Sequence, residues 1–287
     1  MIEKFERAFT FAKASWKVLM LDKEMLLFPI MSAASLVAIV GSGAWVVYLS
    51  PTLQGLAQST LDQAQPDQSP WFWGTAFVLF FVSYFVMIFF NAGLLTCALI
   101  RFGGGNPTIK DGLSSALRRL PHILVWALIT ATVGWLLQIL ESRMRGLGNV
   151  FVDLLGAGWA VATYFVMPIL VVDGVGPVAA VKRSVGAIRK TWGEALVGYV
   201  GLGVLNLGTS LLALPLLFWG VSEFDDNPAL GGGLLAVGIT IMLVSALFVT
   251  TLSAILRAAL FVYARDGEVP DSFDGKLFRS AFQPDEV

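Results

Sequence analysis

The sequence contains few of the side chains that metal sites and catalytic centres usually require. Among its 287 residues there is one histidine, His122, and one cysteine, Cys97. A lone cysteine forms no intrachain disulfide, and one histidine with one cysteine does not complete a zinc site. No Ser–His–Asp order, H-E-x-x-H helix or phosphate-binding glycine loop is present either. We therefore predict no catalytic residue, no metal ligand and no cofactor.

Charged side chains are also scarce. They make up 14% of the sequence, whereas hydrophobic residues make up 56% and the mean hydropathy is +0.76. An ordinary soluble domain has about 25% charged residues. No long polar tract marks off a soluble domain, and the charged N-terminal residues do not resemble a signal peptide. The composition predicts one integral membrane domain over residues 1–287, with no nucleic-acid partner.

Long apolar runs are what the sequence has instead. A bilayer core about 30 Å thick needs roughly 20 apolar residues in one helix, because hydrocarbon offers no partner to a free backbone amide. Six runs meet this requirement and predict an all-α, polytopic membrane protein with six transmembrane helices. The predicted spans are Leu26–Leu49, Trp71–Leu99, Ile123–Leu140, Val150–Val172, Ala195–Trp219 and Leu234–Phe261. Residues 264–287 are predicted to form an exposed C-terminal tail.

The cations between these runs lie mostly on one side of the predicted membrane. Of the 19 Lys and Arg residues, 17 lie on one side: 16 precede the first span, follow the last, or lie in the loops after the second and fourth spans, and Arg257 lies near the end of the last span. The other loops hold only Arg143 and Arg145. Because cytoplasmic loops carry the excess of Lys and Arg, both termini and the two basic loops are predicted to be cytosolic. We expect a multi-pass protein of the cytoplasmic (inner) membrane.

Three basic segments, each ahead of a pair of spans, have the pattern of an amphipathic cytosolic helix. Apolar side chains recur on one helical face, and cations flank that face. The apolar stripes are Phe5, Phe9, Ala12, Trp16 and Leu19; Ile109, Leu113, Ala116, Leu117 and Leu120; and Val178, Val181, Val185, Ile188 and Trp192. Such helices lie flat at a membrane interface, where a nearby cation gains about 1 kcal/mol from anionic lipid. The candidate lipid-headgroup contacts are Lys13, Lys17, Arg118, Arg119, Lys182, Arg183, Arg189 and Lys190.

Two interpretations of these helices stay open. They bind phospholipids or an unidentified membrane-protein partner, or they only fix the topology, as basic interfacial helices do in many multispan proteins. They begin near residues 5, 108 and 176, which divides the chain into three hairpin units. The spacing is uneven and little residue identity is shared, so whether the units are true repeats is also open.

Polar side chains inside the predicted spans are rare. Asn91 and Asn206 are the candidate intramembrane polar positions, and each needs either an interhelical hydrogen bond or a wet cavity. No ionisable residue lies near the middle of a span, which argues against a proton-coupled or ion-coupled transporter. In the fifth span, Gly198, Gly201 and Gly208 share one side, where a neighbouring helix could approach closely.

Several stretches resemble an uncharacterised family of bacterial and archaeal multispan membrane proteins. They include "SWKVLMLDKEMLLFPIMS" from Ser15, "LIRFGGGNPTIKDGL" from Leu99, "WALITATVGWLLQILESR" from Trp126 and "YARDGEVPDSF" from Tyr263. More remotely, the G-P-x-x-A-x-K-R-S pattern at Gly176 to Ser184 is similar to a motif in the membrane domain of some glycerophosphodiester phosphodiesterases. The resemblance implies an integral membrane family without an assigned reaction.

The sequence favours a membrane-embedded scaffold or accessory subunit that engages phospholipid headgroups or a partner. The first alternative is a pore or transporter for a small or lipid-like solute, which would need Asn91 and Asn206 to line a wet cavity. The second is an intramembrane enzyme, which would need His122 to lie close to Glu194 or Asp173.

Overall fold

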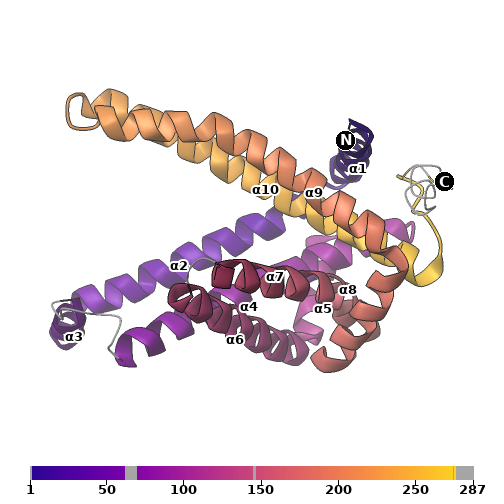
Figure 1. Ribbon diagram of the computed structural model, residues 1–287, viewed down its shortest axis with the longest axis horizontal. Helices are drawn as coiled ribbons and strands as arrows, with labels where there is room; N and C mark the ends of the chain where they lie inside the picture. Colours follow the sequence, from indigo (N-terminus) through magenta and orange to yellow (C-terminus); the bar gives the residue numbers. More distant parts are fainter. Residues whose placement is uncertain (1, 62–69, 145–146, 274, 276–287) are drawn as a thin grey trace. The chain divides into compact units, whose positions relative to one another are not determined.

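The computed structural model describes residues 2–61, 70–144, 147–273 and 275, and all the regular structure in these ranges is helical (Figure 1). The elements are α1 (Ile2–Leu21), the 3-10 helix η1 (Lys23–Leu26), α2 (Leu27–Leu49), α3 (Pro51–Leu61), α4 (Pro70–Phe102), α5 (Ile109–Arg118), α6 (Leu120–Arg143), α7 (Leu147–Ala162), α8 (Val166–Asp173), α9 (Pro177–Glu223) and α10 (Pro228–Asp266). The side chains of residues 2–8, 190–207 and 209, among others, lie outside the described part.

The chain forms two compact units that alternate along the sequence. The first consists of Met1–Leu27, Leu94–Gly112 and Val185–Val287, and the second of Phe28–Gly93 and Leu113–Ser184. The prediction of one membrane domain is neither supported nor opposed by this division, because neither unit is a continuous stretch of chain.

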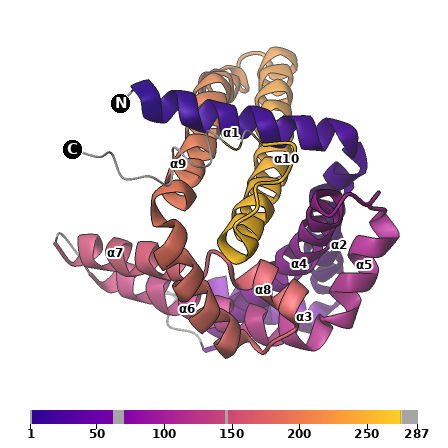
Figure 2. The ribbon, with the colours of Figure 1, turned by 90° about the vertical axis from the view of Figure 1, so that its right-hand side faces the viewer.

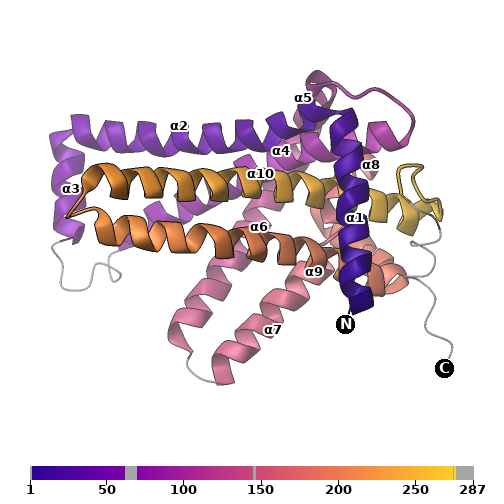
Figure 3. The ribbon, with the colours of Figure 1, turned by 90° about the horizontal axis from the view of Figure 1, so that it is seen from above.

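In the first unit, α9 and α10 form a long antiparallel hairpin (Figures 1 and 3). The turn between them ends at Asn227, whose side chain accepts a hydrogen bond from the Leu230 N–H at 3.2 Å and so caps α10. A β-carbon at Gly231 would lie 2.7 Å from the Cα of Phe224 and 2.8 Å from the carbonyl oxygen of Gly220. The hairpin therefore closes with backbone against backbone, which only glycine permits.

Helix α1 lies across this hairpin and packs against α10 (Figures 2 and 3). Phe11, Ser15, Val18 and Leu19 are buried, which defines the inward face of α1. Trp16 contacts the ring of Phe248 in α10, with 5.2 Å between ring centroids. An amphipathic helix thus sits crosswise on two long apolar helices.

A buried ion pair joins the end of α1 to the end of α4. The carboxylate of Asp22, 7% exposed, accepts hydrogen bonds from both Nε and Nη2 of Arg101. Arg101 Nη2 also donates to Asn106 Oδ1 at 2.8 Å, in the loop before α5. Bidentate pairing of this kind gives geometric precision as well as energy. Arg101 is therefore part of the interior of the first unit.

In the second unit, α6 and α7 lie side by side (Figure 3). Trp126 and Trp159 stack across them with ring centroids 6.0 Å apart. Further along α6, Trp135 contacts Trp73, Phe77 and Phe80 of α4 at centroid distances of 5.4, 5.9 and 5.7 Å. Aromatic side chains thus hold α4 and α6 together.

Five helical segments are long and apolar enough to cross a membrane. They are Lys23–Leu49, Trp73–Phe102, Leu120–Arg143, Val150–Asp173 and Pro228–Asp266. These five cover most of the first four and the sixth of the predicted spans. The fifth predicted span, Ala195–Trp219, falls largely on side chains outside the described part, and α9 contributes the shorter apolar stretch Ser210–Glu223. Six spans therefore stay a prediction.

Two helix boundaries differ from the expectation. The predicted continuous helix Val150–Val172 is interrupted by a turn at Thr163–Phe165, between α7 and α8. Pro168 follows the interruption and has no N–H to extend the hydrogen-bond ladder back into α7. Conversely, the third basic segment and the fifth predicted span form one helix, α9, because glycines in this stretch weaken a helix without ending it.

Candidate functional site

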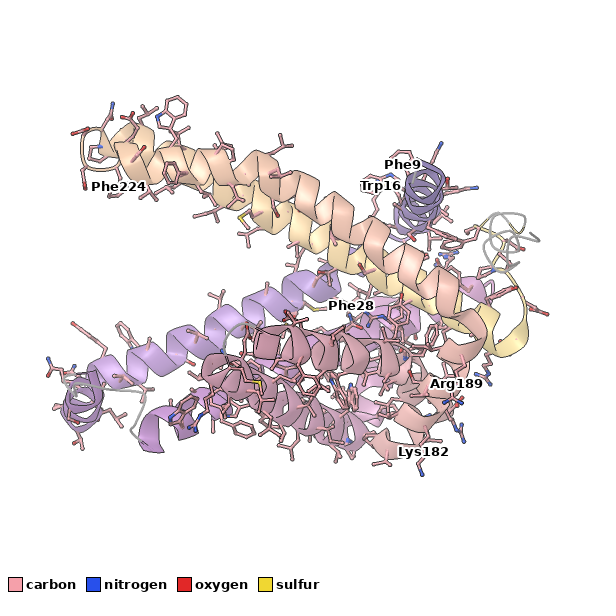
Figure 4. All side chains as sticks on the ribbon, in the orientation of Figure 1. Phe9, Trp16, Phe28, Lys182, Arg189 and Phe224 are labelled. Carbon is pink, nitrogen blue, oxygen red and sulfur yellow. The ribbon has the colours of Figure 1, made fainter. Side chains whose placement is uncertain are left out.

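The surface of α1 has three parts around its circumference. One side, which includes Phe11 and Val18, is buried. On another side Phe9 is 66% exposed and Trp16 43% exposed (Figure 4). Exposed Lys13 and Lys17 follow next, one helical turn apart. The stripe drawn from the sequence is thus divided: Ala12 and Leu19 are buried, whereas Phe9 and Trp16 remain on the surface beside the lysines.

Around α5, as around α1, a buried side, an exposed apolar residue and exposed cations follow one another. Its inward side carries Ser115 and Ala116, which are both buried. Leu117 is 58% exposed and lies next to exposed Arg118, with Lys110 exposed two turns earlier. Thr108 and Asp111 cap the helix reciprocally: the Thr108 N–H donates to Asp111 Oδ2 at 3.0 Å, and the Asp111 N–H donates to Thr108 Oγ1 at 3.2 Å.

The start of α9 likewise has a buried side, an exposed apolar residue and exposed cations. Ala180 and Ser184 are fully buried, whereas Val178 is 67% exposed. Lys182 and Arg189 are exposed and point away from the helix (Figure 4). The side chain of the last candidate cation, Lys190, lies outside the described part.

Two of the candidate headgroup contacts interact with α8 instead of standing free at the surface. Arg119 is half-buried; its Nε donates to the carbonyl oxygen of Val171 at 3.4 Å. Its guanidinium group occupies the space that a β-carbon at Gly174 would need. Arg183 Nη1 donates to Asp173 Oδ2 at 2.5 Å, while the arginine side chain stays 55% exposed. Both cations lie at the C-terminal end of α8, where its backbone dipole favours positive charge.

The other end of α8 is held by Ser184. Its Oγ accepts a hydrogen bond of 3.1 Å from the N–H of Phe165, the residue just before α8. The donor and acceptor are both buried, so the bond gives the amide just ahead of α8 a partner from α9. Helix α8 is therefore fixed at both ends by side chains from outside it. Sequence reasoning missed both residues: Gly174 has the local signature of a helix end, whereas the bond of Ser184 to a residue 19 positions earlier has none.

The polar positions inside the predicted spans are described only in part. Asn91 is half-buried, and its Oδ1 is enclosed without a hydrogen bond. The side chain of Asn206 lies outside the described part. His122 Nδ1 is likewise enclosed without a hydrogen bond, so that nitrogen does not pair with Asp173. The side chain of Glu194 lies outside the described part. The expectation of an interhelical bond or a wet cavity at Asn91 and Asn206 therefore stays a prediction.

No group of three or more His, Cys, Asp or Glu side chains within the described ranges comes close enough to hold a metal ion. Cys97 is buried at the end of α4, and its Sγ lies 3.5 Å from the carbonyl oxygen of Thr108. The candidate sites of the described residues are therefore the surfaces of α1, α5 and α9 and a pocket between α4 and α6.

Comparison with protein families gives a match over most of the chain. A family model described as a family of unknown function (DUF6159) matches residues 72–271, which covers most of the chain. No curated protein matches the sequence. The match agrees with the resemblance to an uncharacterised family, whereas a bacterial or archaeal source and the likeness to phosphodiesterase membrane domains stay predictions.

Proposed function

We propose that this chain, which belongs to the DUF6159 family of unknown function, is a membrane-embedded scaffold or accessory subunit whose basic helices engage phospholipid headgroups. The coarser part of this statement rests on five helices with the length and composition of membrane spans. The finer part, lipid engagement, rests on the surfaces of α1, α5 and the start of α9.

The observation that carries the proposal is the exposure of apolar side chains directly beside cations. Phe9, Leu117 and Val178 are each more than half exposed, on three different helices, and each has exposed Lys or Arg close by on the same helix. In water this arrangement leaves apolar area unburied. At the boundary between headgroups and acyl chains it satisfies both kinds of side chain, because the apolar residue enters the acyl region and the cation meets phosphate.

Helix α1 supports the proposal best. Phe9 and Trp16 are seven residues apart and so lie on one side of the helix. They project toward the side on which α9 and α10 run to Phe224 (Figure 4). If α9 and α10 cross the bilayer, Phe9 and Trp16 enter its surface, and Lys13 and Lys17 stay at headgroup level. We further propose that this surface is the cytosolic face of the inner membrane, because the sorting of cations along the chain favours that orientation.

The depth of α1 in the membrane can be measured with spin labels on the full chain in phosphatidylglycerol-containing nanodiscs. In a Cys97→Ser background, oxygen should enhance the spin relaxation of labels at Phe9→Cys and Trp16→Cys. A water-soluble nickel chelate should have little effect on them. A label at Lys17→Cys should show the opposite preference, because it faces the headgroups. Nickel accessibility equal at all three positions would contradict an interfacial α1.

The contribution of charge needs a separate comparison. Lys13→Gln with Lys17→Gln should lower the amount of phosphatidylglycerol that copurifies with the protein, because each cation contributes about 1 kcal/mol of attraction. The matched control is Lys13→Arg with Lys17→Arg, which keeps both charges and should retain the lipid. Equal loss in both double variants would assign the effect to packing instead of charge.

Transport is the second candidate function, and one observation favours it. The segment Val150–Asp173 is a candidate span that is interrupted at Thr163–Phe165. Interrupted spans in transporters form substrate sites because their free backbone groups face the substrate. Here Ser184 already satisfies the Phe165 N–H, which weighs against an open site. We also propose that the chain is not an enzyme, since no acid is bonded to His122 Nδ1.

A further inference from the structure

A pocket of about 260 Å³ opens between α4 and α6 in the second unit. It lies near the start of α4 and the end of α6, at the ends of these helices away from the α5 connection. The lining residues are Trp73, Ala76, Trp135, Gln138, Ile139 and Ser142. The basic helices contribute none of them, so the pocket is separate from the lipid-binding surfaces proposed above.

One wall of the pocket is a pair of tryptophans. The rings of Trp73 and Trp135 meet edge to face, with 5.4 Å between centroids and 88° between planes. Phe77 and Phe80 contact Trp135 as well, at 5.9 and 5.7 Å, and restrict its rotation. The wall is therefore present before any ligand binds. Ala76 leaves the space that a larger side chain at that position would fill.

The α6 side of the pocket alternates between apolar and polar side chains. Trp135 and Ile139 are apolar, whereas Gln138 and Ser142 bring an amide and a hydroxyl to the lining. Ser142 Oγ donates to the Ile139 carbonyl oxygen at 2.9 Å, which leaves its lone pairs free to accept. Arg143 is exposed one turn beyond Ile139, at the last residue of α6. At 1.5 Å per residue, the sequence from Trp135 to Arg143 spans about 12 Å.

We infer that this pocket binds one glycerophospholipid molecule, with part of an acyl chain against Trp73, Ala76 and Ile139 and the phosphate at Arg143. Both helices are candidate membrane spans, Trp73–Phe102 and Leu120–Arg143, so lipid surrounds the pocket. The apolar wall suits an acyl chain, the Gln138 amide can donate a hydrogen bond to an ester oxygen, and Arg143, one turn beyond Ile139, can pair with the phosphate. The volume lies below the range of about 300 to 1,000 Å³ typical of sites for whole drug-sized ligands, which fits a chain segment better.

The probe for this site is phosphatidylglycerol that carries a photoactivatable diazirine in one acyl chain. The full-length protein is reconstituted in phosphatidylcholine nanodiscs, irradiated and digested, and labelled peptides are quantified by mass spectrometry. Peptides that contain Ala76 and Ile139 should be labelled about fivefold more than the exposed apolar surface around Leu243, which corresponds to a preference of about 1 kcal/mol. Equal labelling of pocket and surface would overturn the inference.

Two filling variants separate the pocket from the general surface. Ala76→Phe and, from the opposite wall, Ile139→Phe should each reduce pocket labelling to the level of the surface. The matched control is Leu136→Phe, which enlarges an exposed side chain on α6 outside the lining and should leave labelling unchanged. Thermal unfolding in detergent identifies any variant that fails to fold. Unchanged pocket labelling in a folded filling variant would contradict the assignment.

The phosphate contact is tested with a second probe. Diacylglycerol with the same diazirine chain lacks the phosphate and should label the wild-type pocket several-fold less than phosphatidylglycerol. Arg143→Gln should reduce labelling by phosphatidylglycerol to the level of diacylglycerol. If both probes label the wild-type pocket equally, the site recognises only an acyl chain and a phospholipid is the wrong ligand.

Discussion

At the scale of single residues, neighbouring cations have different roles. Arg118 is exposed, whereas the next residue, Arg119, turns inward to the Val171 carbonyl and to Gly174. Arg101 is held by buried Asp22. In the sequence these three cations belong to one predicted loop, between the second and third spans, and all of them fit the positive-inside pattern. Their individual roles depend on which partner the fold brings within reach, so of the two candidate headgroup contacts here Arg118 is exposed and Arg119 is half-buried.

Gly174 gives a prediction at this scale. It ends α8 with φ of +63°, a left-handed conformation that costs other residues about 1 to 2 kcal/mol. A β-carbon there would also collide with the guanidinium of Arg119. We expect Gly174→Ala to lower the free energy of unfolding by at least this amount, which thermal or denaturant unfolding in detergent micelles measures.

The control for this variant is Gly176→Ala. Gly176 lies two residues away, has no positive φ and has open space around its missing β-carbon. Its substitution should leave the unfolding midpoint within error of the wild type. If the two variants were equally stable, Arg119 and the left-handed turn would not hold the end of α8.

At the scale of elements, the α9–α10 hairpin shows how a pattern in the sequence can point to the wrong residues. Glycines in the fifth predicted span suggested a close approach, yet Gly208 has nothing within 4 Å of its missing β-carbon. Gly198 and Gly201 lie outside the described side chains. The hairpin glycines in tight contact are Gly220 and Gly231, near the turn, and Gly238 further along α10. The spacing of glycines along one helix predicts a face without side chains. Where a second helix packs against that face depends on the position of the second helix.

The hairpin provides a prediction of its own. Gly231→Val places side-chain atoms where the backbone of Phe224 and Gly220 now lies, so α9 and α10 must separate. Overpacking of this kind costs about 1 to 3 kcal/mol. We expect a lower unfolding midpoint in detergent than for Gly233→Val, a substitution in the same helix at a glycine with open space around it. Equal midpoints would mean that the helices are not in close contact at Gly231.

At the scale of the whole molecule, the number of membrane crossings is the main question. Five described segments qualify as spans, and α9 decides whether there is a sixth. The sorting of cations requires an even number, because the basic segments at both ends of the chain are predicted to face the cytosol. An α9 that fails to cross would place the basic residues after α10 on the outer side, against this rule.

Reporter fusions test this topology directly. A fusion after Gln65 should be active only with a reporter that works outside the cytosol, and a fusion after Gly186 only with a cytosolic reporter. A fusion after Asn227 distinguishes six crossings from five, because it should behave like the one after Gln65 if α9 spans the membrane. Cytosolic activity after Asn227 would refute the six-span arrangement.

Composition and apolar runs were enough to predict a lipid environment and the helices, because long apolar segments have no stable alternative to helix in lipid. Several helix ends could also be predicted, because proline and glycine clusters end helices locally. The sequence also placed Lys13, Lys17 and Lys182 on surfaces. The packing of the helices, in contrast, was needed to show that Arg119 turns inward, that α8 is separate from α7, and that Trp73 and Trp135 line a pocket. These features arise from residues far apart in the chain, such as Phe165 and Ser184, and no local pattern records which distant side chains will meet.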